Sequence, residues 1–239
     1  MKLFNLDSPI MILLGKMADL MIINILTIIC CLPIITVGPA FTAAHYVCLK
    51  IVRNEECYIV RSYFKSFKEN FVQATVIWLL ILAAAGILAG DYFIITKSGL
   101  EFSRVLKIAI IVVGVVVLFM TVYAFPALAK FDNTIRATIK NAFLMSIWQF
   151  PKTILMLIIY VAPAIIAIFI YQAIPVVMLL GIAVPVYLCA MLYNKFFQRL
   201  EDQIIEAQEA AQGPKEEDPD KIFSDKLDEA LIEENMNQQ

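Results

Sequence analysis

The chain has 239 residues, of which 61% are apolar and 17% carry a charge, and its mean hydropathy is +0.80. This composition lies outside the range of an ordinary water-soluble domain and argues against a globular enzyme with a large core. The net charge of -2 combines a basic body, residues 1–194 at +6, with an acidic tail, residues 195–239 at -8, and neither part shows a nucleic-acid-binding pattern.

Four long stretches contain no Asp, Glu, Lys or Arg: residues 20–49, 71–90, 108–129 and 153–194. A helix of about 20 apolar residues crosses the hydrocarbon core of a bilayer, so each stretch can hold one span and the last can hold two. We therefore predict an all-α, polytopic transmembrane helix bundle with about five spans, short interfacial helices and an acidic cytoplasmic tail. The predicted domains are a transmembrane domain, residues 1–200, and a partly helical tail, residues 201–239.

The first helix is expected to begin near Asp7-Ser8-Pro9, where a capping side chain precedes a proline. Charged residues interrupt this region, so it does not have the pattern of a cleavable signal. Span one is predicted over about residues 18–35. Only about 11 uncharged residues then separate Pro39 from Lys50, fewer than a straight span needs. We interpret residues 39–53 as a re-entrant or interfacial helix; a sixth span, which would reverse the side of the amino terminus, is left open.

The next segment has an aromatic face and a basic face. Phe64, Phe67 and Phe71 recur at helical spacing, and so do Arg61, Lys65 and Lys68. This pattern predicts a basic amphipathic helix at the membrane surface.

The remaining spans are predicted over about residues 71–90, 108–129, 153–170 and 175–193. Gly86 and Gly90 have the GxxxG spacing of a helix-packing face. Pro163 and Pro185 are expected to kink the last two spans, which form a hairpin. In the tail, an apolar residue at every fourth position predicts a short amphipathic helix; these residues are Phe223, Leu227 and Leu231.

Orientation follows from the basic residues near the span ends. The side that carries the carboxyl terminus has 11 such residues, and the other side has 5, among them Lys2 and Lys16. The positive-inside rule then predicts a cytoplasmic carboxyl terminus and an amino terminus outside.

Groups that could carry chemistry are scarce in the spans. No acid, base or metal-ligand cluster lies at mid-span, and the five cysteines lack metal-ligand spacing. The sequence therefore predicts no catalytic residue, no cofactor and no metal site. We expect that the protein is not an enzyme. A membrane enzyme is kept as a third interpretation, beside two non-catalytic functions.

A polar face is predicted on span one. Asn24, Thr27 and Cys31 share this face, and Thr42 and His45 follow in the next segment. Their side chains either make hydrogen bonds between helices or line a polar pocket.

Two similar elbows precede apolar runs on the predicted cytoplasmic side. The first contains Lys65, Lys68 and Asn70, and the second contains Lys140 and Asn141. Anchoring at the membrane surface explains both elbows. The alternative is that they are docking sites for a partner, together with Phe223, Leu227 and Leu231 in the tail.

Several segments together resemble the YesL family of bacterial membrane proteins, DUF624: residues 4–9, 18–20 with Asn24, 31–40, 63–71, 125–127 with Asn141, and 193–197. The resemblance covers nearly the whole chain and implies a Bacillota-type cytoplasmic membrane. Genes of this family commonly lie beside carbohydrate ABC-transporter and polysaccharide-degradation genes. The family is of unknown function and has no established site residues, so none is assigned from it.

These observations lead to two main functional expectations. The first is a multi-pass accessory component of carbohydrate uptake that contacts the lipid bilayer and the permease subunits of a sugar ABC transporter. The second is an autonomous small-solute channel or facilitator, whose path would be lined by the polar face of span one. The ligand and the oligomeric state are left open.

Overall fold

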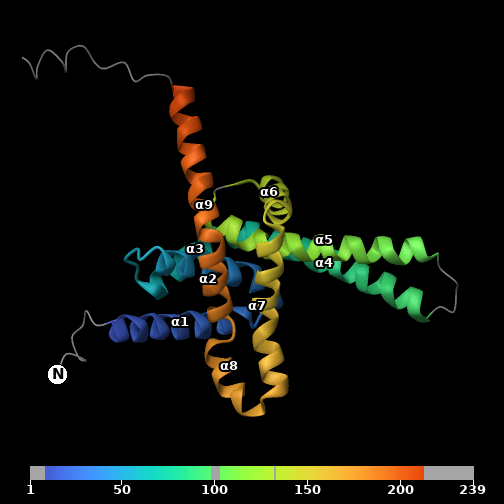
Figure 1. Ribbon diagram of the computed structural model, residues 1–239, viewed down its shortest axis with the longest axis horizontal. Helices are drawn as coiled ribbons and strands as arrows, with labels where there is room; N and C mark the ends of the chain where they lie inside the picture. The colour runs from blue at the N-terminus through green and yellow to red at the C-terminus, as the bar shows by residue number, and fades with distance from the viewer. Residues whose placement is uncertain (1–8, 98–102, 132, 213–239) are drawn as a thin grey trace, which may run out of the picture. The chain divides into compact units, whose positions relative to one another are not determined.

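The computed structural model describes residues 9–97, 103–131 and 133–212, and its regular elements are all helices or helical turns (Figure 1). The chain divides into two units, Met1–Asn194 and Lys195–Gln239, which are described separately. The described residues contain no strand, and five of their helices are long and apolar enough to cross a membrane. These findings confirm the predicted all-α, polytopic fold.

The elements follow one another in a simple order. They are α1 (Pro9–Cys31), the 3-10 turn η1 (Ile34–Thr36), α2 (Val37–Val52), α3 (Ile59–Glu69), α4 (Phe71–Lys97), α5 (Arg104–Lys130), α6 (Ile135–Trp148), α7 (Phe150–Phe169), the 3-10 turn η2 (Tyr171–Ala173), α8 (Ile174–Leu180) and α9 (Ala183–Gln212). The described part of the second unit is the carboxyl-terminal part of α9.

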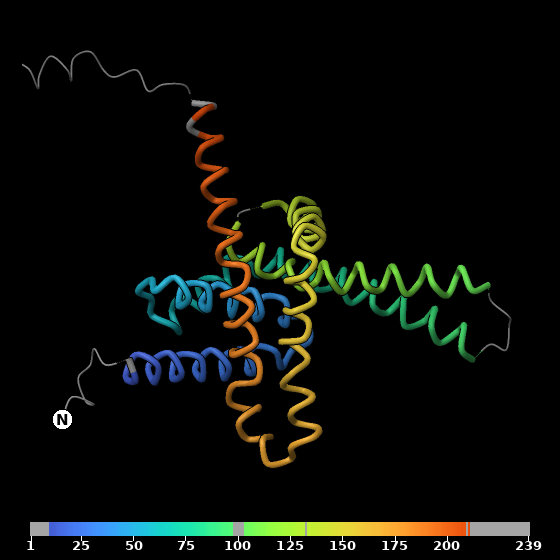
Figure 2. Tube along the Cα trace, viewed as in Figure 1, coloured from blue at the N-terminus to red at the C-terminus, as the bar shows by residue number. Residues whose placement is uncertain are grey.

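The five span-length helices are α1, α2 extended by η1, α4, α5 and α7. Helices α4 and α5 pack against each other as a hairpin (Figure 2). Many of their apolar side chains, such as Ile87 and Ile111, are exposed. Such faces are expected to contact lipid, which is as apolar as the side chains themselves.

The segment between residues 34 and 52 differs from its sequence-based interpretation. It is one helical segment of 19 residues, because η1 continues into α2 and Pro39 lies in the first turn of that helix. A proline is tolerated there, since the first N–H groups of a helix have no intrahelical partner. The argument that the segment is too short to cross is therefore wrong.

Helices α1 and α2 form an antiparallel pair. The ammonium of Lys16 on α1 donates a hydrogen bond to Oδ1 of Asn54, just after α2, at 2.9 Å. The end of α2 thus lies beside the amino-terminal half of α1, as expected if α2 returns to the side from which α1 starts.

The last predicted span is broken. Helix α8 ends at Leu180, α9 begins at Ala183, and the two are bent by 60°. In a continuous helix, the ring of Pro185 would clash with the carbonyl of Gly181, four residues earlier. The chain therefore breaks before Pro185, where the sequence predicted a kinked but continuous helix, whereas Pro163 lies inside the unbroken α7.

The core of the first unit is built around α2. Four of its small side chains, Ala40, Ala43, Ala44 and Val47, are fully buried against neighbouring helices. A close approach occurs at Gly38, where a Cβ atom would overlap the Ala74 carbonyl oxygen and lie 2.8 Å from Cβ of Trp78. Small residues allow this approach between helices.

Gly86 and Gly90 have no such role within the chain. A Cβ atom added at either glycine would meet nothing within 4 Å. The prediction that their GxxxG spacing marks a packing face is therefore wrong for contacts inside this molecule.

The predicted amphipathic helix corresponds to α3, but its buried face differs. Tyr63 and Ser66 are buried, while Phe64 and Phe71 are exposed. The aromatic residues at helical spacing thus do not mark the side of α3 that packs against the protein.

Candidate functional site

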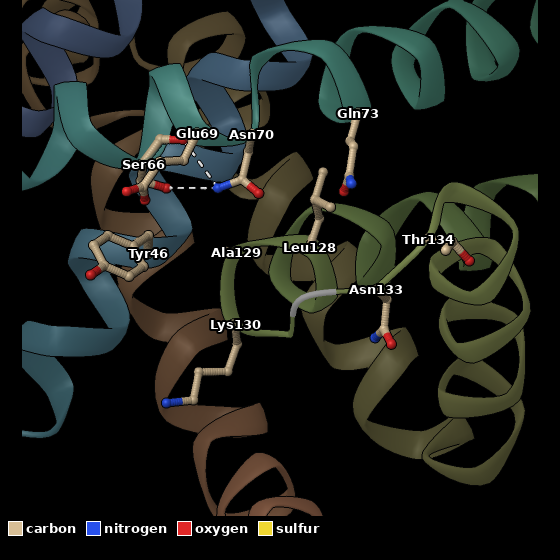
Figure 3. A pocket seen from close by; sticks show the side chains of 10 residues that line it. All are labelled: Tyr46, Ser66, Glu69, Asn70, Gln73, Leu128, Ala129, Lys130, Asn133 and Thr134. Atoms are coloured by element: carbon tan, nitrogen blue, oxygen red, sulfur yellow. Dashed lines mark hydrogen bonds between the residues drawn. The ribbon is translucent and has the colours of Figure 1, made fainter.

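A polar pocket of about 620 Å³ lies where α2, α3, α4, the end of α5 and the α5–α6 connection meet (Figure 3). It is lined by Tyr46, Ser66, Glu69, Asn70, Gln73, Leu128, Ala129, Lys130, Asn133 and Thr134. These residues come from segments far apart in the sequence, so the fold creates the pocket.

Two helix ends fix the polar groups of this pocket. Asn70 ends α3, and its Nδ2 donates to the carbonyl oxygen of Ser66 at 3.1 Å. Thr134 caps α6, and its Oγ1 accepts a hydrogen bond from the backbone N–H of Ala137 at 3.4 Å. Such caps satisfy backbone groups that a helix end leaves without partners.

The pocket offers a mixed set of donors and acceptors. Glu69 supplies a carboxylate, Lys130 an ammonium, and Asn70, Gln73 and Asn133 supply amides. Amide and hydroxyl groups can both donate and accept hydrogen bonds. The arrangement suits a polar ligand or the polar side chains of a partner protein.

Asn24 was predicted on the polar face of span one, and its amide holds the α8–α9 break. Its Oδ1 accepts from the backbone N–H groups of Ile182 at 2.9 Å and Ala183 at 3.1 Å. Its Nδ2 donates to the carbonyl oxygen of Met178 at 2.8 Å. The side chain is fully buried and replaces hydrogen bonds that the broken helix cannot make within itself.

Thr27 and Thr42 are also buried and bonded within the chain. Thr27 donates to the Ile23 carbonyl at 2.7 Å and accepts from the Tyr63 hydroxyl at 3.3 Å. Thr42 donates to the Gly38 carbonyl at 3.0 Å. Cys31, the third residue predicted on this face, is half-buried.

His45 joins two tyrosines that lie far from it in sequence. Its Nδ1 is 3.1 Å from the hydroxyl of Tyr193, and its Nε2 is 2.9 Å from the hydroxyl of Tyr160. His45 and Tyr160 also line an apolar cavity of about 310 Å³ between α2, α4, α5 and α7. The histidine therefore links α2, α7 and α9 by hydrogen bonds.

Residues 20–92 match a protein family described as a protein of unknown function, DUF624. This part of the chain, less than half of its length, is therefore similar to the DUF624 family. No curated protein matches the chain, and no solved structure matches it either.

The DUF624 region runs from α1 into α4 and contains Asn24, Thr27, Thr42, His45 and Asn70. It supplies half of the polar pocket, from Tyr46 to Gln73. The motifs at residues 125–127 and 193–197, which also carry the family resemblance, lie outside the matched region.

The predicted docking residues are only partly brought together. Asn70 lines the polar pocket, whereas Lys65, Lys68 and Lys140 are exposed and Asn141 is half-buried outside it. Phe223, Leu227 and Leu231 lie outside the described residues. The second elbow therefore does not line the pocket; Asn133 and Thr134, which precede α6 and lie outside that elbow, do.

Sequence reasoning missed the three tyrosines that bind the polar face. Tyr63, Tyr160 and Tyr193 are separated from their partners by 36, 115 and 148 residues. A tyrosine in an apolar run can lie at the lipid boundary or in the core, and its hydroxyl group can form a hydrogen bond in either place. The available signal was that these spans contain few polar groups. Such groups, when buried, are expected to form hydrogen bonds with one another.

Proposed function

We propose that this protein is a non-catalytic, multi-pass membrane protein that serves as an accessory component of ABC-type carbohydrate uptake. It would bind permease subunits of the transporter through the surface around the polar pocket. The observation that carries this proposal is the pocket itself, in which the Asn70 elbow meets the connection before α6.

The chemistry of the pocket supports binding to a partner. Its lining contains a carboxylate, an ammonium, amides and hydroxyls within one concave surface. Polar groups of this kind fix the orientation of a bound group, and a concave surface excludes water around it. The link to carbohydrate uptake comes from the resemblance to the YesL family.

The charge distribution supports a position of the pocket at the cytoplasmic face of a bacterial plasma membrane. The pocket lies beside the carboxyl-terminal half of α2, the ends of α3 and α5 and the start of α4. Basic residues near these ends include Lys50, Arg53, Lys68 and Lys130. An excess of basic residues is typical of cytoplasmic connections.

Affinity purification from native membranes in mild detergent tests the proposal. The wild-type chain should recover sugar-permease subunits, and the double variant Gln73→Leu, Asn133→Leu should recover about fivefold less, because both substitutions remove polar groups from the pocket. Asn141→Ala is the matched control, since Asn141 lies outside the pocket, and it should recover as much as wild type.

Failure of the wild-type chain to recover any permease subunit would overturn the proposal. Recovery of as much permease by the double variant as by wild type would show that the pocket is not the binding surface. The alternative function, an autonomous channel or facilitator, has no comparable support, because Asn24 and Thr27 make their hydrogen bonds within the chain. Solute flux through liposomes that contain only this protein would favour that alternative.

A further inference from the structure

A second concave surface lies between α1 and the start of α3. It is a groove of about 630 Å³ lined by Ile22, Cys57, Tyr58, Ile59, Val60, Arg61 and Phe64. Tyr58, Val60 and Phe64 are exposed, so the groove is open on one side. None of the residues that line this groove lines the polar pocket proposed to bind a partner.

The groove combines apolar walls with one cation. Ile22, Ile59, Val60 and Phe64 form apolar surface, and Arg61 supplies a guanidinium. The residues that line the groove include no carboxylate. A guanidinium binds phosphate oxygens through paired hydrogen bonds, so Arg61 suits a phosphate group.

The groove lies at the boundary between polar and apolar parts of the chain. On α1, Lys16 and Asp19 precede an uncharged run that starts at Leu20, and Ile22 is less than one turn into that run. The Lys16–Asn54 hydrogen bond lies on the polar side of this boundary. A group bound in the groove can therefore reach hydrocarbon and headgroup regions together.

Charges near Cys57 indicate which part of the groove suits a phosphate. Burial is the main cause that raises the pKa of the Cys57 thiol; Lys50 lowers it, and Asp19 and Glu55 raise it further. Carboxylates are thus close to Cys57, where they would repel an anion. The phosphate position is at Arg61, with Lys65 one turn further along α3.

We infer that this groove binds one anionic phospholipid, whose phosphate contacts Arg61 and whose acyl chain lies along Ile22, Val60 and Phe64. The apolar walls select a lipid over a free phosphate, because only a lipid covers them. Because Arg61 is positively charged and the lining residues include no carboxylate, the groove favours an anionic headgroup over a neutral one.

Native mass spectrometry of the full chain in detergent measures this binding. The probes are phosphatidylglycerol and phosphatidylcholine with identical acyl chains, and the readout is the apparent Kd of the first bound lipid. Phosphatidylglycerol should bind more tightly. Arg61→Gln should weaken its binding about fivefold, as expected for the loss of one basic residue at a membrane surface. Arg61→Lys keeps the charge but loses the paired hydrogen bonds, so it should weaken binding less than Arg61→Gln.

Arg136→Gln is the matched control, since Arg136 is an exposed arginine on α6 that does not line the groove. It removes the same charge and should leave the affinity for phosphatidylglycerol unchanged. The circular dichroism melting midpoint of each variant checks that the fold is intact, and Arg61 is exposed, so its substitution should not unfold the protein.

Three results would overturn the inference. The first is equal affinity for the two lipids, and the second is the same weakening by Arg136→Gln as by Arg61→Gln. The third is full competition by glycerol 1-phosphate, which has the phosphate but no acyl chain and would show a site for a soluble phosphate.

Discussion

Asn24 carries three hydrogen bonds to one break in the backbone, and no other polar side chain described above serves so many backbone groups. Leucine has nearly the same size but cannot donate or accept a hydrogen bond. Asn24→Leu should lower the free energy of unfolding by about 1–3 kcal/mol, because buried backbone groups lose their partners. Denaturant titration in detergent, followed by circular dichroism, measures this change.

Asn24→Asp provides a second test, because it removes only part of these hydrogen bonds. A carboxylate can accept from Ile182 and Ala183 but cannot donate to Met178, and its charge is unfavourable in a buried site. It should therefore also destabilise the protein. Unchanged stability of Asn24→Leu would show that the break does not depend on this amide.

His45 depends on two hydroxyl groups, and their removal can be tested one at a time. Tyr160→Phe and Tyr193→Phe each leave one imidazole nitrogen without its partner. Each should lower the free energy of unfolding by about 1 kcal/mol. Tyr171→Phe is the control, because Tyr171 is 81% exposed and its change should have no effect. A loss as large in the control would contradict the assignment.

The cysteines differ in burial, and thiol labelling should report it. Cys48 is fully buried and should not react with a maleimide in the folded protein. Burial raises the pKa of Cys57, so less of it is thiolate at neutral pH.

Cys57 should therefore react more slowly at pH 7 than a cysteine introduced by Lys65→Cys at an exposed site. The difference should narrow as the pH rises, because the Cys57 thiol is then increasingly deprotonated as well. The rates are measured in variants that keep only the cysteine in question. Equal rates at pH 7 would contradict the burial of Cys57.

At the scale of the elements, the contact between α2 and α4 depends on one glycine. Gly38→Ala would place a methyl group against the Ala74 carbonyl and Trp78, so α4 would have to move. The free energy of unfolding should fall by about 1–3 kcal/mol. Thermal unfolding in detergent measures this effect.

Gly86→Ala is the matched control for that substitution. An added methyl group at Gly86 meets nothing within 4 Å, and alanine is the better helix former, so stability should stay equal or rise by up to about 1 kcal/mol. A loss at Gly86 similar to that at Gly38 would show that α4 has a packing face that this chain alone does not reveal.

The sequence predicted the helices well and their contacts poorly. Uncharged runs identify spans because backbone groups must be satisfied inside a helix when lipid surrounds it. The same apolar composition makes lipid-facing and buried positions alike, so Gly86 could not be distinguished from Gly38. Phe64 and Tyr63 show the same ambiguity, because both fit a helix at a membrane surface.

The sequence predicted individual residues of the candidate sites, but it did not predict which residues would lie together. Asn24, His45 and Asn70 attract attention as polar groups in or beside apolar runs. Their partners could not be deduced, because Ile182 and Tyr193 are brought close by tertiary packing of helices distant in sequence. The polar pocket likewise depends on the meeting of five segments.

For the whole molecule, the antiparallel pairing of α1 and α2 determines which side the amino terminus occupies. If α2 crosses, the start of α1 and all of α3 lie on the same side. Lys2 and Lys16 then join the basic side, and the distribution of basic residues changes from 11 against 5 to 13 against 3. This stronger asymmetry agrees better with the positive-inside rule.

We therefore expect an amino-terminal epitope tag and a cysteine at Lys65→Cys to be accessible from the same side. Protease digestion of the tag and labelling of the cysteine are compared in right-side-out and inverted membrane vesicles. Access from opposite sides would mean that α2 does not cross. The hydrogen bond from Arg53 Nε to Asn194 Oδ1, at 2.8 Å, also brings the end of α2 beside the exit of the last helix pair.

The three hydrogen bonds of Asn24 have a consequence for biosynthesis. The ribosome makes Asn24 158 residues before Ile182, which corresponds to roughly ten to thirty seconds of translation. When α8 and α9 enter the bilayer, their break exposes backbone groups that only a helix already in place can satisfy. Helices α8 and α9 therefore mature against α1, and a chain without α1 would lack the side chain that completes their break.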